Sequence, residues 1–395
     1  MHRIEPNDGE TLKMENEEMY ISIVLPCLNE SETLLKVIKK CFYSLEVGNY
    51  SGEVIVADNG STDGSIEIAK NSGAVLVEVA EKGYGSALRA GISASKGKFV
   101  VMGDSDDSYS LDDLDPFIAK LESGFDLVVG NRFQGGIEKG AMPWLHKYLG
   151  NPVLTYIGKI LYKVPINDFH CGLRAFRREP FMKLHLSCPG MEFASEMIVK
   201  SSLHNLKIAE VPTKLRKDGR SRPPHLNTWR DGWRHLVFLL LASPNWLFVR
   251  PAIFLFTLGT SNLLFSFLSQ TPKTEVIQSN LLFFYLGLVF ILIATQCGIF
   301  ALLARLFAKK HEFIPSPQAT TVVERIFTIG RGIFVGIFMI VISIALSAFC
   351  FVSSKNSTLQ LSESTIRISG LLALSFCVGI QVVSSSFFAA ILRLD

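Results

Sequence analysis

Apolar and polar positions follow two alternating patterns in the first half of the chain. Short apolar runs rich in β-branched residues are bounded by Gly, Pro, Asn or Asp, which is typical of buried strands. The expected strands are residues 20–25, a run that Pro26 ends, 53–57, 74–79, 99–102 and 126–130. Between them apolar positions recur with helical spacing, most clearly in residues 32–45, for which Ser31 is the expected N-cap. This alternation predicts an α/β domain with a Rossmann-like, mostly parallel sheet.

The second half of the chain carries long runs without any Asp, Glu, Lys, Arg or His. These runs are residues 251–269, 281–304, 333–353 and 368–392. Each is close to the roughly 20 residues that cross a bilayer as an α-helix, so we predict four transmembrane helices. The loop 305–332 is richer in Lys and Arg than the loops 270–280 and 354–367. By the positive-inside rule this loop is cytoplasmic, and both termini and the α/β domain are then cytoplasmic too.

A stretch with Trp and Arg links the two halves. Trp229 and Trp233 begin an apolar stripe at helical spacing, and Arg230, Asp231 and Arg234 lie off it. Such a helix fits the membrane interface, and a core-facing helix is the alternative until the runs that follow are considered. The predicted parts of the chain are a loose polar tail (1–18), the α/β domain (19–227), an amphipathic membrane-interface region (228–249) and a transmembrane domain (250–395).

The composition excludes some functions and leaves others open. The 395 residues are 48% hydrophobic, and a formal net charge of +3 is too small to indicate nucleic-acid binding. The seven Cys are scattered without metal-ligand spacing, as expected for reduced residues in or facing a cytoplasm. Residues 1–18 are polar and predict no cleavable signal peptide. The pattern leaves homo-oligomerisation open.

Polar clusters follow the expected strands at their carboxyl ends. Asp104 and Asp106 come after the strand 99–102, and a spacing of two places both side chains on one side of an extended chain. Neighbouring carboxylates repel each other unless a cation lies between them, and Mg²⁺ combines one or two carboxylates with water and substrate phosphates. Residues 26–30, Asp58 and Arg132 fall at other strand ends, where α/β sheets bind their ligands. The pattern favours a phosphorylated substrate and a divalent metal at this edge, whereas an isolated Asp-x-Asp would be read as an acidic loop.

A series of short motifs carries a resemblance to a known family. They are residues 24–30, 56–63, 82–87, 103–106, 130–136, 168–176 and 190–196. In this order they resemble the inverting family 2 glycosyltransferases with the GT-A fold, and the later motifs are similar to the dolichyl-phosphate mannose synthase-like branch. The resemblance covers roughly residues 20–245. The transmembrane half is similar to the accessory region of some such enzymes only in its general layout.

The resemblance implies a site for a nucleotide-sugar donor, with either UDP or GDP as the nucleotide. Pro26, Leu28 and Glu30 would line the nucleoside pocket, and Asp58 would contact the base. The implied donor-binding residues are Pro26, Leu28, Glu30, Asp58, Lys82, Gly83 and Asp104. Asp106, with Asp104 beside it, would bind the Mg²⁺ or Mn²⁺ that bridges the diphosphate. Asn59 stands where many relatives carry a second Asp, and Ser108 where some carry a Gln in the metal shell, so the third metal ligand is left open.

The same resemblance implies a polyprenyl phosphate as the acceptor in the membrane. Arg132 matches the arginine that such enzymes aim at the acceptor phosphate. The expected acceptor-phosphate residues are Arg132, Lys147, Arg174, Arg216, Arg220 and Arg222. A lipid phosphate is already an anion and needs no strong general base, so the main catalytic requirement is charge stabilisation. The residues expected to provide it are Asp104, Asp106 with its metal, and Arg132. Three roles are open for Glu192: a catalytic base, a contact to the sugar, or a surface carboxylate. His170 would either lie near the acceptor or be a structural histidine with satisfied hydrogen bonds, and the second interpretation is favoured.

Other functions fit parts of the pattern. A processive polysaccharide synthase resembles this domain, but its Gln-x-x-Arg-Trp motif is missing before the membrane segments. A transporter or lipid flippase would carry ionisable residues inside its spans, and the apolar runs have none. A scaffold that binds a nucleotide sugar without turnover is the non-enzymatic alternative.

Overall fold

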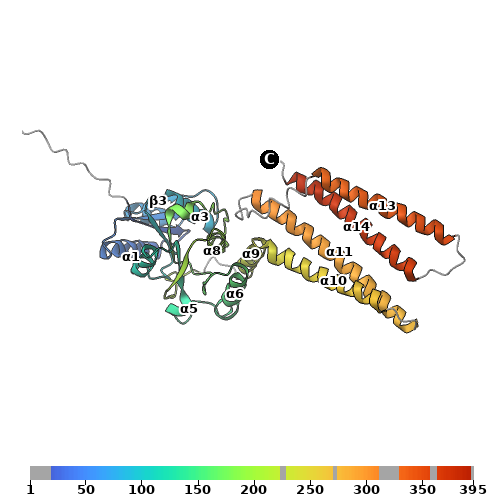
Figure 1. Ribbon diagram of the computed structural model, residues 1–395. Helices are drawn as coiled ribbons and strands as arrows, with labels where there is room; N and C mark the ends of the chain where they lie inside the picture. Colours follow the sequence, from blue (N-terminus) through green and yellow to red (C-terminus); the bar gives the residue numbers. More distant parts are fainter. Residues whose placement is uncertain (1–18, 223–227, 270–273, 311–328, 356–362, 393–395) are drawn as a thin grey trace, which may run out of the picture. The chain divides into compact units, whose positions relative to one another are not determined.

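The computed structural model describes residues 19–222, 228–269, 274–310, 329–355 and 363–392. These fall into two compact units that divide between Leu236 and Val237 (Figure 1). The predicted tail 1–18 and most of the loop 305–332 lie outside the described residues.

The first unit is built on a sheet with the strand order β3-β2-β1-β4-β6-β5-β7. The strands are β1 (Ile21–Cys27), β2 (Gly52–Asp58), β3 (Val75–Glu78), β4 (Phe99–Met102), β5 (Leu127–Asn131), β6 (Arg174–Arg177) and β7 (Ile208–Pro212). Neighbouring strands are parallel except at β6, which runs antiparallel to β4 and β5. The predicted mostly parallel α/β fold is confirmed, and β6 and β7 are strands that the apolar pattern did not indicate.

β1 continues through Pro26, where the sequence predicted its end. The Pro26 carbonyl accepts a hydrogen bond from the Ser105 hydroxyl at 2.7 Å, so this residue's backbone polar groups face the side of β4. On that side the ladder has already stopped, because Val24 is the last residue of β1 that pairs with β4. The missing N–H of Pro26 therefore breaks no ladder bond, while pairing with β2 continues to Cys27.

Helices connect the strands with the spacing that the sequence predicted. The first, α1 (Leu34–Val47), buries an apolar stripe made of Leu34, Val37, Ile38, Cys41 and Leu45. It begins after Thr33 and not at the predicted cap Ser31. The Thr33 hydroxyl donates to the Ser105 carbonyl at 2.7 Å, which ties the start of α1 to the turn after β4. The other helices are α2 (Ser65–Asn71), α3 (Tyr84–Ala94), α4 (Asp115–Glu122), α5 (Arg132–Gly135), the π-helical turn η1 (His146–Gly150), α6 (Asn151–Tyr162), α7 (Arg178–Met182), α8 (Phe193–Leu203) and α9 (Thr228–Leu241), which crosses the boundary between the units.

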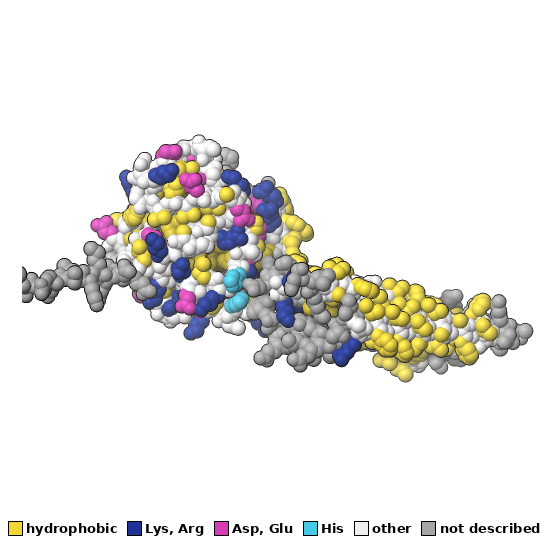
Figure 2. Space-filling model, turned by 90° about the horizontal axis from the view of Figure 1, so that it is seen from above, with side chains coloured by type: hydrophobic (Ala, Val, Ile, Leu, Met, Phe, Trp, Pro, Cys, Tyr) yellow, Lys and Arg dark blue, Asp and Glu magenta, His cyan; other side chains and the backbone are white. Residues whose placement is uncertain are grey.

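The second unit consists of long apolar helices. They are α10 (Arg250–Leu268), which follows the turn η2 (Asn245–Val249), α11 (Thr274–Lys310), α13 (Ile329–Lys355) and α14 (Glu363–Ile391). Within the described residues, four helices are long and apolar enough to cross a membrane, as predicted. Hydrophobic side chains cover these helices, whereas charged side chains are spread over the first unit (Figure 2).

Each helical hairpin of this unit closes through a reciprocal glycine contact. Gly259 of α10 faces Gly287 of α11, and Gly336 of α13 faces Gly379 of α14. A Cβ at any of these glycines would come within 2.7 to 2.9 Å of the partner glycine's carbonyl oxygen. The aliphatic residue four positions after each glycine packs over the partner glycine; these residues are Leu263, Ile291, Ile340 and Val383. Such close backbone approach is a common way for membrane helices to pack.

Arg367 lies inside α14, although the sequence placed it in a loop. Its guanidinium donates to the Ser266 carbonyl at 2.9 Å, in the last turn of α10, and lies over the rings of Phe267 and Phe284. A cation at a helix C-terminus is favourable because it meets the negative end of the helix dipole. Arg367 therefore ties the α13–α14 hairpin to the α10–α11 hairpin.

Candidate functional site

Asp58 ends β2 with one oxygen available to a ligand. The side chain is 1% exposed, and its Oδ2 accepts hydrogen bonds from the N–H groups of Gly60 and Ser61 at 2.8 and 2.9 Å. Its Oδ1 is buried without a hydrogen-bond partner among the described residues. Because a buried oxygen without a partner costs free energy, Oδ1 is suited to accept a hydrogen bond from a bound molecule.

Asp104 and Asp106 lie in the turn after β4 and not in an extended strand. The Tyr84 hydroxyl donates to Asp104 Oδ1 at 2.9 Å. Gly172 leaves room for the other oxygen, since a Cβ there would come within 2.5 Å of Asp104 Oδ2. Burial, followed by the neighbouring Asp106 carboxylate, raises the pKa of Asp104 to about 6. The structure thus brings the two predicted acids close enough to repel each other.

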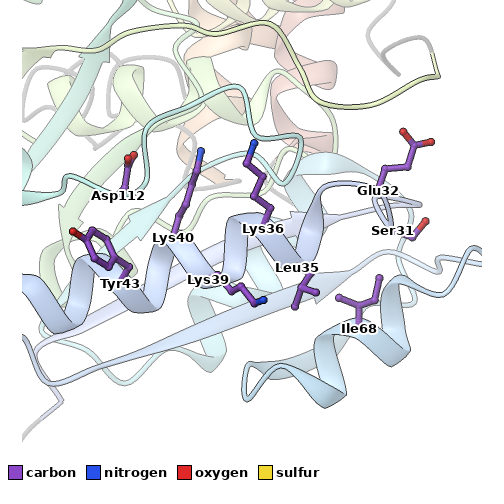
Figure 3. A pocket seen from close by; sticks show the side chains of 9 residues that line it. All are labelled: Ser31, Glu32, Leu35, Lys36, Lys39, Lys40, Tyr43, Ile68 and Asp112. Carbon is purple, nitrogen blue, oxygen red and sulfur yellow. The ribbon is translucent and has the colours of Figure 1, made fainter.

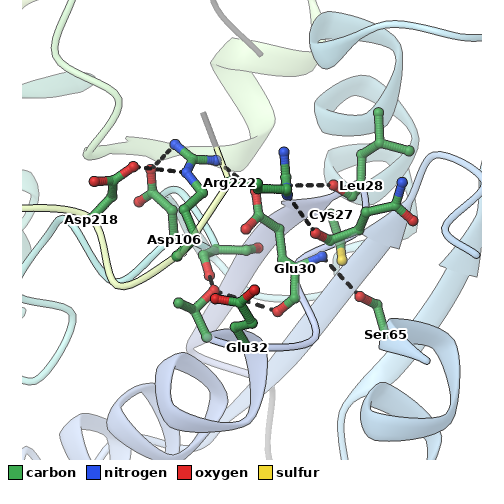
Figure 4. A network of polar contacts seen from close by, with 12 residues as sticks. Cys27, Leu28, Glu30, Glu32, Ser65, Asp106, Asp218 and Arg222 are labelled. Atoms are coloured by element: carbon green, nitrogen blue, oxygen red, sulfur yellow. Dashed lines mark hydrogen bonds and ion pairs between the residues drawn. The ribbon is translucent and has the colours of Figure 1, made fainter. Parts of the chain in front are cut away.

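Arg220 joins Asp106 to Glu30, and both of these acids are labelled in Figure 4. Its nitrogens lie 2.7 Å from Asp106 Oδ2, 2.8 Å from Glu30 Oε1 and 2.8 Å from Asp218 Oδ2. The second oxygen of Asp106 accepts the N–H of Ser108 at 3.0 Å. Burial raises the pKa of Glu30, and its Oε2 is buried without a partner in the described part of the chain. This cluster gathers three carboxylates at one edge of the sheet.

The segment Arg216–Arg222 closes over the same edge. Its backbone N–H groups at Arg216 and Gly219 donate to the carbonyls of Ser108 and Asp106, both at 2.9 Å. Arg222 donates to the carbonyls of Leu28 and Asn29 at 2.9 and 3.0 Å. A cavity of about 260 Å³ opens here, lined by Asn29, Glu30, Ser31, Glu32, Thr62, Asp63, Arg220 and Arg222. Arg220 and Arg222 therefore contact the residues of the predicted nucleoside pocket, although the sequence assigned them to the acceptor.

Arg132, the first residue of α5, forms a bidentate ion pair with Asp168. Its Nε and Nη2 lie 2.7 and 2.8 Å from the two carboxylate oxygens, and its backbone N–H adds a bond at 3.0 Å. Asp168 is fully buried, and Arg132 is 8% exposed. Nη1 donates to no described residue, so this edge of the guanidinium is left for an anion.

His170 follows Asp168 by two residues and packs against α9. Its ring lies edge-on to the ring of His235, with 4.6 Å between centroids, and His235 Nδ1 bonds the Ser195 hydroxyl at 2.8 Å. Both ring nitrogens of His170 are buried without a partner among the residues described. Burial, together with His235 and Arg132, holds the pKa of His170 well below its usual value. The ring is thus neutral and unsatisfied, and not the satisfied structural histidine that the sequence favoured.

Asn59 fastens the glycine loop to the sheet edge. Its Nδ2 donates to the carbonyls of Val79 and Glu81 at 3.3 and 2.7 Å. Its Oδ1 accepts the N–H of Gly83 at 2.7 Å, and its carbonyl accepts Lys82 Nζ at 2.6 Å. A carboxylate could not donate to these carbonyls, which gives a physical reason for Asn at this position.

The glycine loop supports the residues that precede α8. Gly85 donates its N–H to the Pro189 carbonyl at 2.8 Å, and a Cβ at Gly83 would come within 2.2 Å of that carbonyl. Glu192 follows directly before α8, and its Oε2 is buried without a partner in the described chain. The buried oxygen argues against the interpretation of Glu192 as a surface carboxylate. The two other predicted roles, a catalytic base or a contact to the sugar, stay open.

The donor atoms at this edge fit a divalent cation that completes its shell with water and substrate oxygens. Asp104 and Asp106 supply hard carboxylate oxygens from neighbouring positions, as Mg²⁺ and Mn²⁺ prefer. Among the described residues, no group of three or more His, Cys, Asp or Glu forms a complete cage. Both oxygens of Asp106 already accept hydrogen bonds, from Arg220 and from the N–H of Ser108, so a cation held by the two predicted acids would replace Arg220 at Asp106.

Some of the predicted acceptor residues are positioned elsewhere. Arg174 is fully buried at the start of β6, and its guanidinium donates to the carbonyls of Phe169, Cys171 and Ala194 at 2.8, 2.9 and 2.5 Å. It holds the turn before β6, so the expected phosphate contact is wrong for Arg174. Lys147 lies in η1 with its ammonium 5.5 Å from the centre of the Tyr148 ring.

A larger hollow of about 730 Å³ lies along α1 (Figure 3). Its lining residues are Ser31, Glu32, Leu35, Lys36, Lys39, Lys40, Tyr43, Ile68 and Asp112. Lys36 and Lys40 pair with Asp107 at 2.6 and 2.5 Å, which fixes the turn beside Asp106. None of the predicted site residues line this hollow, whereas Glu30, Arg220 and Arg222 line the smaller cavity.

Sequence reasoning missed the residues that hold the site in place. Asp168, Tyr84 and Asp218 each bond a predicted site residue. One feature of the sequence could have indicated Asp168. It is an acid close to the apolar residues Phe169 and Ile166, and a carboxylate buried among apolar residues needs a cation as its partner.

Two family models and several known proteins match this chain. The model "Glycosyl transferase family 2" matches residues 22–184, and "Glycosyltransferase family 2 C-terminal transmembrane region" matches residues 302–393. The low-salt glycan biosynthesis hexosyltransferase Agl6 of Haloferax volcanii is 32% identical over 371 residues, which are 93% of this chain and 87% of the relative. A dolichyl-phosphate hexose transferase of the same organism is 29% identical over 197 residues, which are 50% of this chain and 83% of that relative. Glucosyl-3-phosphoglycerate synthase from Mycobacterium tuberculosis, solved with Mn²⁺ and UDP-glucose, is 26% identical with a TM-score of 0.46, covering 57% of this chain and 79% of its own.

Proposed function

Because this chain belongs to glycosyltransferase family 2 and carries the family's transmembrane region, we propose that it transfers a sugar from a UDP- or GDP-sugar to polyprenyl phosphate. The transfer inverts the anomeric carbon and uses Mg²⁺ or Mn²⁺. The observation that carries this proposal is the buried guanidinium of Arg132, which Asp168 holds with one edge left for an anion. In a chain with four candidate spans in its described part, the anion that suits this edge is the phosphate of a membrane lipid.

The donor binds at the ends of β1, β2 and β4. Pro26, Leu28 and Glu30 line the nucleoside pocket, and the unpartnered Oδ1 of Asp58 accepts a hydrogen bond from the base. Lys82 and Gly83 complete this side through the loop that Asn59 fixes. Arg220 and Arg222 add positive charge next to Glu30.

The chemistry needs orientation and charge stabilisation more than proton transfer. An oxygen of the acceptor phosphate attacks the anomeric carbon, and the bond from that carbon to the nucleoside diphosphate breaks. Arg132 orients the acceptor phosphate, and Asp104 and Asp106 hold the cation. When bound, that cation neutralises charge on the leaving diphosphate. Glu192, next to the glycine loop, binds a hydroxyl of the transferred sugar.

We place the catalytic unit and both termini in the cytoplasm. The support is the excess of Lys and Arg in the loop 305–332 over the other connecting loops. Nucleotide sugars are then available to the site from the same side.

The test is label transfer by the purified full-length protein in lipid with polyprenyl phosphate. A panel of labelled UDP- and GDP-sugars is offered with Mg²⁺ or Mn²⁺, and we expect one of them to label the lipid fraction. Asp106→Ala should abolish this label, whereas Asp113→Ala, a change at an exposed acid, should not. Absence of label from every nucleotide sugar would contradict the proposal, and a ladder of polymer lengths would show a processive synthase instead.

A further inference from the structure

The stretch from Pro143 to Ile160, which covers η1 and most of α6, presents an apolar face to solvent. Every exposed side chain in this stretch is apolar or aromatic. Of the large hydrophobic side chains here, Trp144, Tyr148 and Tyr156 are the most exposed, at 71%, 60% and 66%. Proteins rarely leave such a continuous apolar face uncovered, so it marks an interaction surface.

The opposite face of α6 is fixed to the first unit, so the apolar face cannot turn inward. Gly158 lies on the ring of Phe169, where a Cβ would come within 2.6 Å of the ring. Thr155 Oγ1 accepts the N–H of Phe169 at 3.3 Å, and Lys159 Nζ donates to Asn167 Oδ1 at 2.8 Å.

We propose that this face rests in the head-group region of the lipid bilayer. Trp and Tyr combine an apolar ring with a polar tip and are enriched at that depth. The Lys147 ammonium lies over the Tyr148 ring, 5.5 Å from its centre, which places a positive charge where lipid phosphates are found. The chain's own spans keep a bilayer within reach of this unit at all times, which favours lipid over a protein partner.

The proposed surface is joined to the site through short contacts. Phe169, which Thr155 and Gly158 touch, directly follows Asp168, and Asp168 holds Arg132. A helix that rests at the head-group level would therefore set the depth of Arg132 relative to the lipid phosphates. The surface itself does not depend on the identity of the acceptor.

The experiment measures the surroundings of Trp144 in the full-length protein, reconstituted at one copy per nanodisc. The emission of Trp144 is obtained by subtracting the fluorescence spectrum of Trp144→Phe from that of the wild type. We expect this difference emission to be blue-shifted, quenched by lipids brominated near the glycerol backbone, and protected from iodide. Tyr43→Trp in the Trp144→Phe background is the matched control, since Tyr43 is an exposed aromatic residue on α1 at 57% exposure. It should be quenched by iodide and not by the brominated lipid.

A second variant keeps the test informative if Trp144 is sensitive to substitution. Leu149→Glu combined with Tyr156→Glu changes only exposed positions, so the fold should persist, and it should reduce the lipid quenching of Trp144 several-fold. Iodide quenching of Trp144 equal to that of the Tyr43→Trp control would overturn the proposal. Protection from both iodide and brominated lipid would also overturn it, because it would mean that protein covers this face.

Discussion

Replacing Asp104 with Asn tests the electrostatics of the site directly. Folding raises the pKa of this carboxyl from 3.8 to about 6, through burial first and the Asp106 carboxylate second. A rise of about 2 pH units corresponds to about 3 kcal/mol by which the ionised carboxylate destabilises the folded state at pH 8. Asn keeps an acceptor for the Tyr84 hydroxyl and carries no charge. Asp104→Asn should therefore be more stable than wild type by up to about 3 kcal/mol at pH 8.

The pH dependence has a defined sign. The folded state favours the protonated carboxyl, so the stability that Asp104 contributes is fully present below its unfolded pKa of 3.8 and is lost as the pH rises through about 6. Asn does not titrate. The advantage of the variant should therefore fall to about half between pH 8 and pH 5.

Thermal unfolding of the full-length protein in detergent measures this effect. For a unit of this size, about 3 kcal/mol corresponds to a Tm increase of about 6–12 °C at pH 8. Asp113→Asn, at an exposed acid, is the control and should leave Tm unchanged. The reasoning is refuted if Asp104→Asn gives no increase at pH 8, or an increase of the same size at pH 5. The variant should also lose label transfer, because it removes one of the two carboxylates that we propose as metal ligands.

Two further changes probe residues that support the site. Asp168→Asn leaves the buried guanidinium of Arg132 without a carboxylate and should lower the free energy of unfolding by about 3–5 kcal/mol, measured by denaturant titration. A loss below about 1 kcal/mol would contradict a buried pair. Asn59→Asp places an oxygen against the Glu81 carbonyl, so it should cost about 1–3 kcal/mol and speed amide hydrogen exchange in the glycine loop. The exposed Asn49→Asp is its control, and equal exchange in both variants would argue against the role of the amide.

The apolar pattern located most of the sheet because a buried parallel strand needs a continuous apolar run. β1, β2, β4 and β5 met this condition, and the partly exposed edge strand β3 also carries an apolar run. The predicted bounds of these five strands differ from the observed ones by at most two residues. β6 did not meet the condition, because it begins and ends with Arg174 and Arg177. Both guanidiniums donate to backbone carbonyls that lie outside β6 in the sequence, so a local pattern could not show that these charges are satisfied within the fold.

The location of the candidate site could be predicted from the sequence, whereas the pairs that its side chains form could be predicted less well. Parallel strands end at one edge, so Asp58, Asp104 and Asp106 could be assigned there from spacing alone. Arg220 lies more than a hundred residues from Asp106 along the chain, and only the folded segment shows that it reaches Asp106 and Glu30. Which side chains pair depends on contacts between distant parts of the chain. Residue types and their spacing carry no information about such contacts.

The matching glycine contacts of the two helical hairpins bear on how this region is assembled. Each of the four helices repeats the same short signature, a glycine with an aliphatic residue four positions later, and each hairpin uses it in the same reciprocal way. During biosynthesis a hairpin of this kind can close on itself as soon as its second helix emerges. Insertion into the bilayer can then proceed in two paired steps, each of which returns the growing chain to the side from which it started.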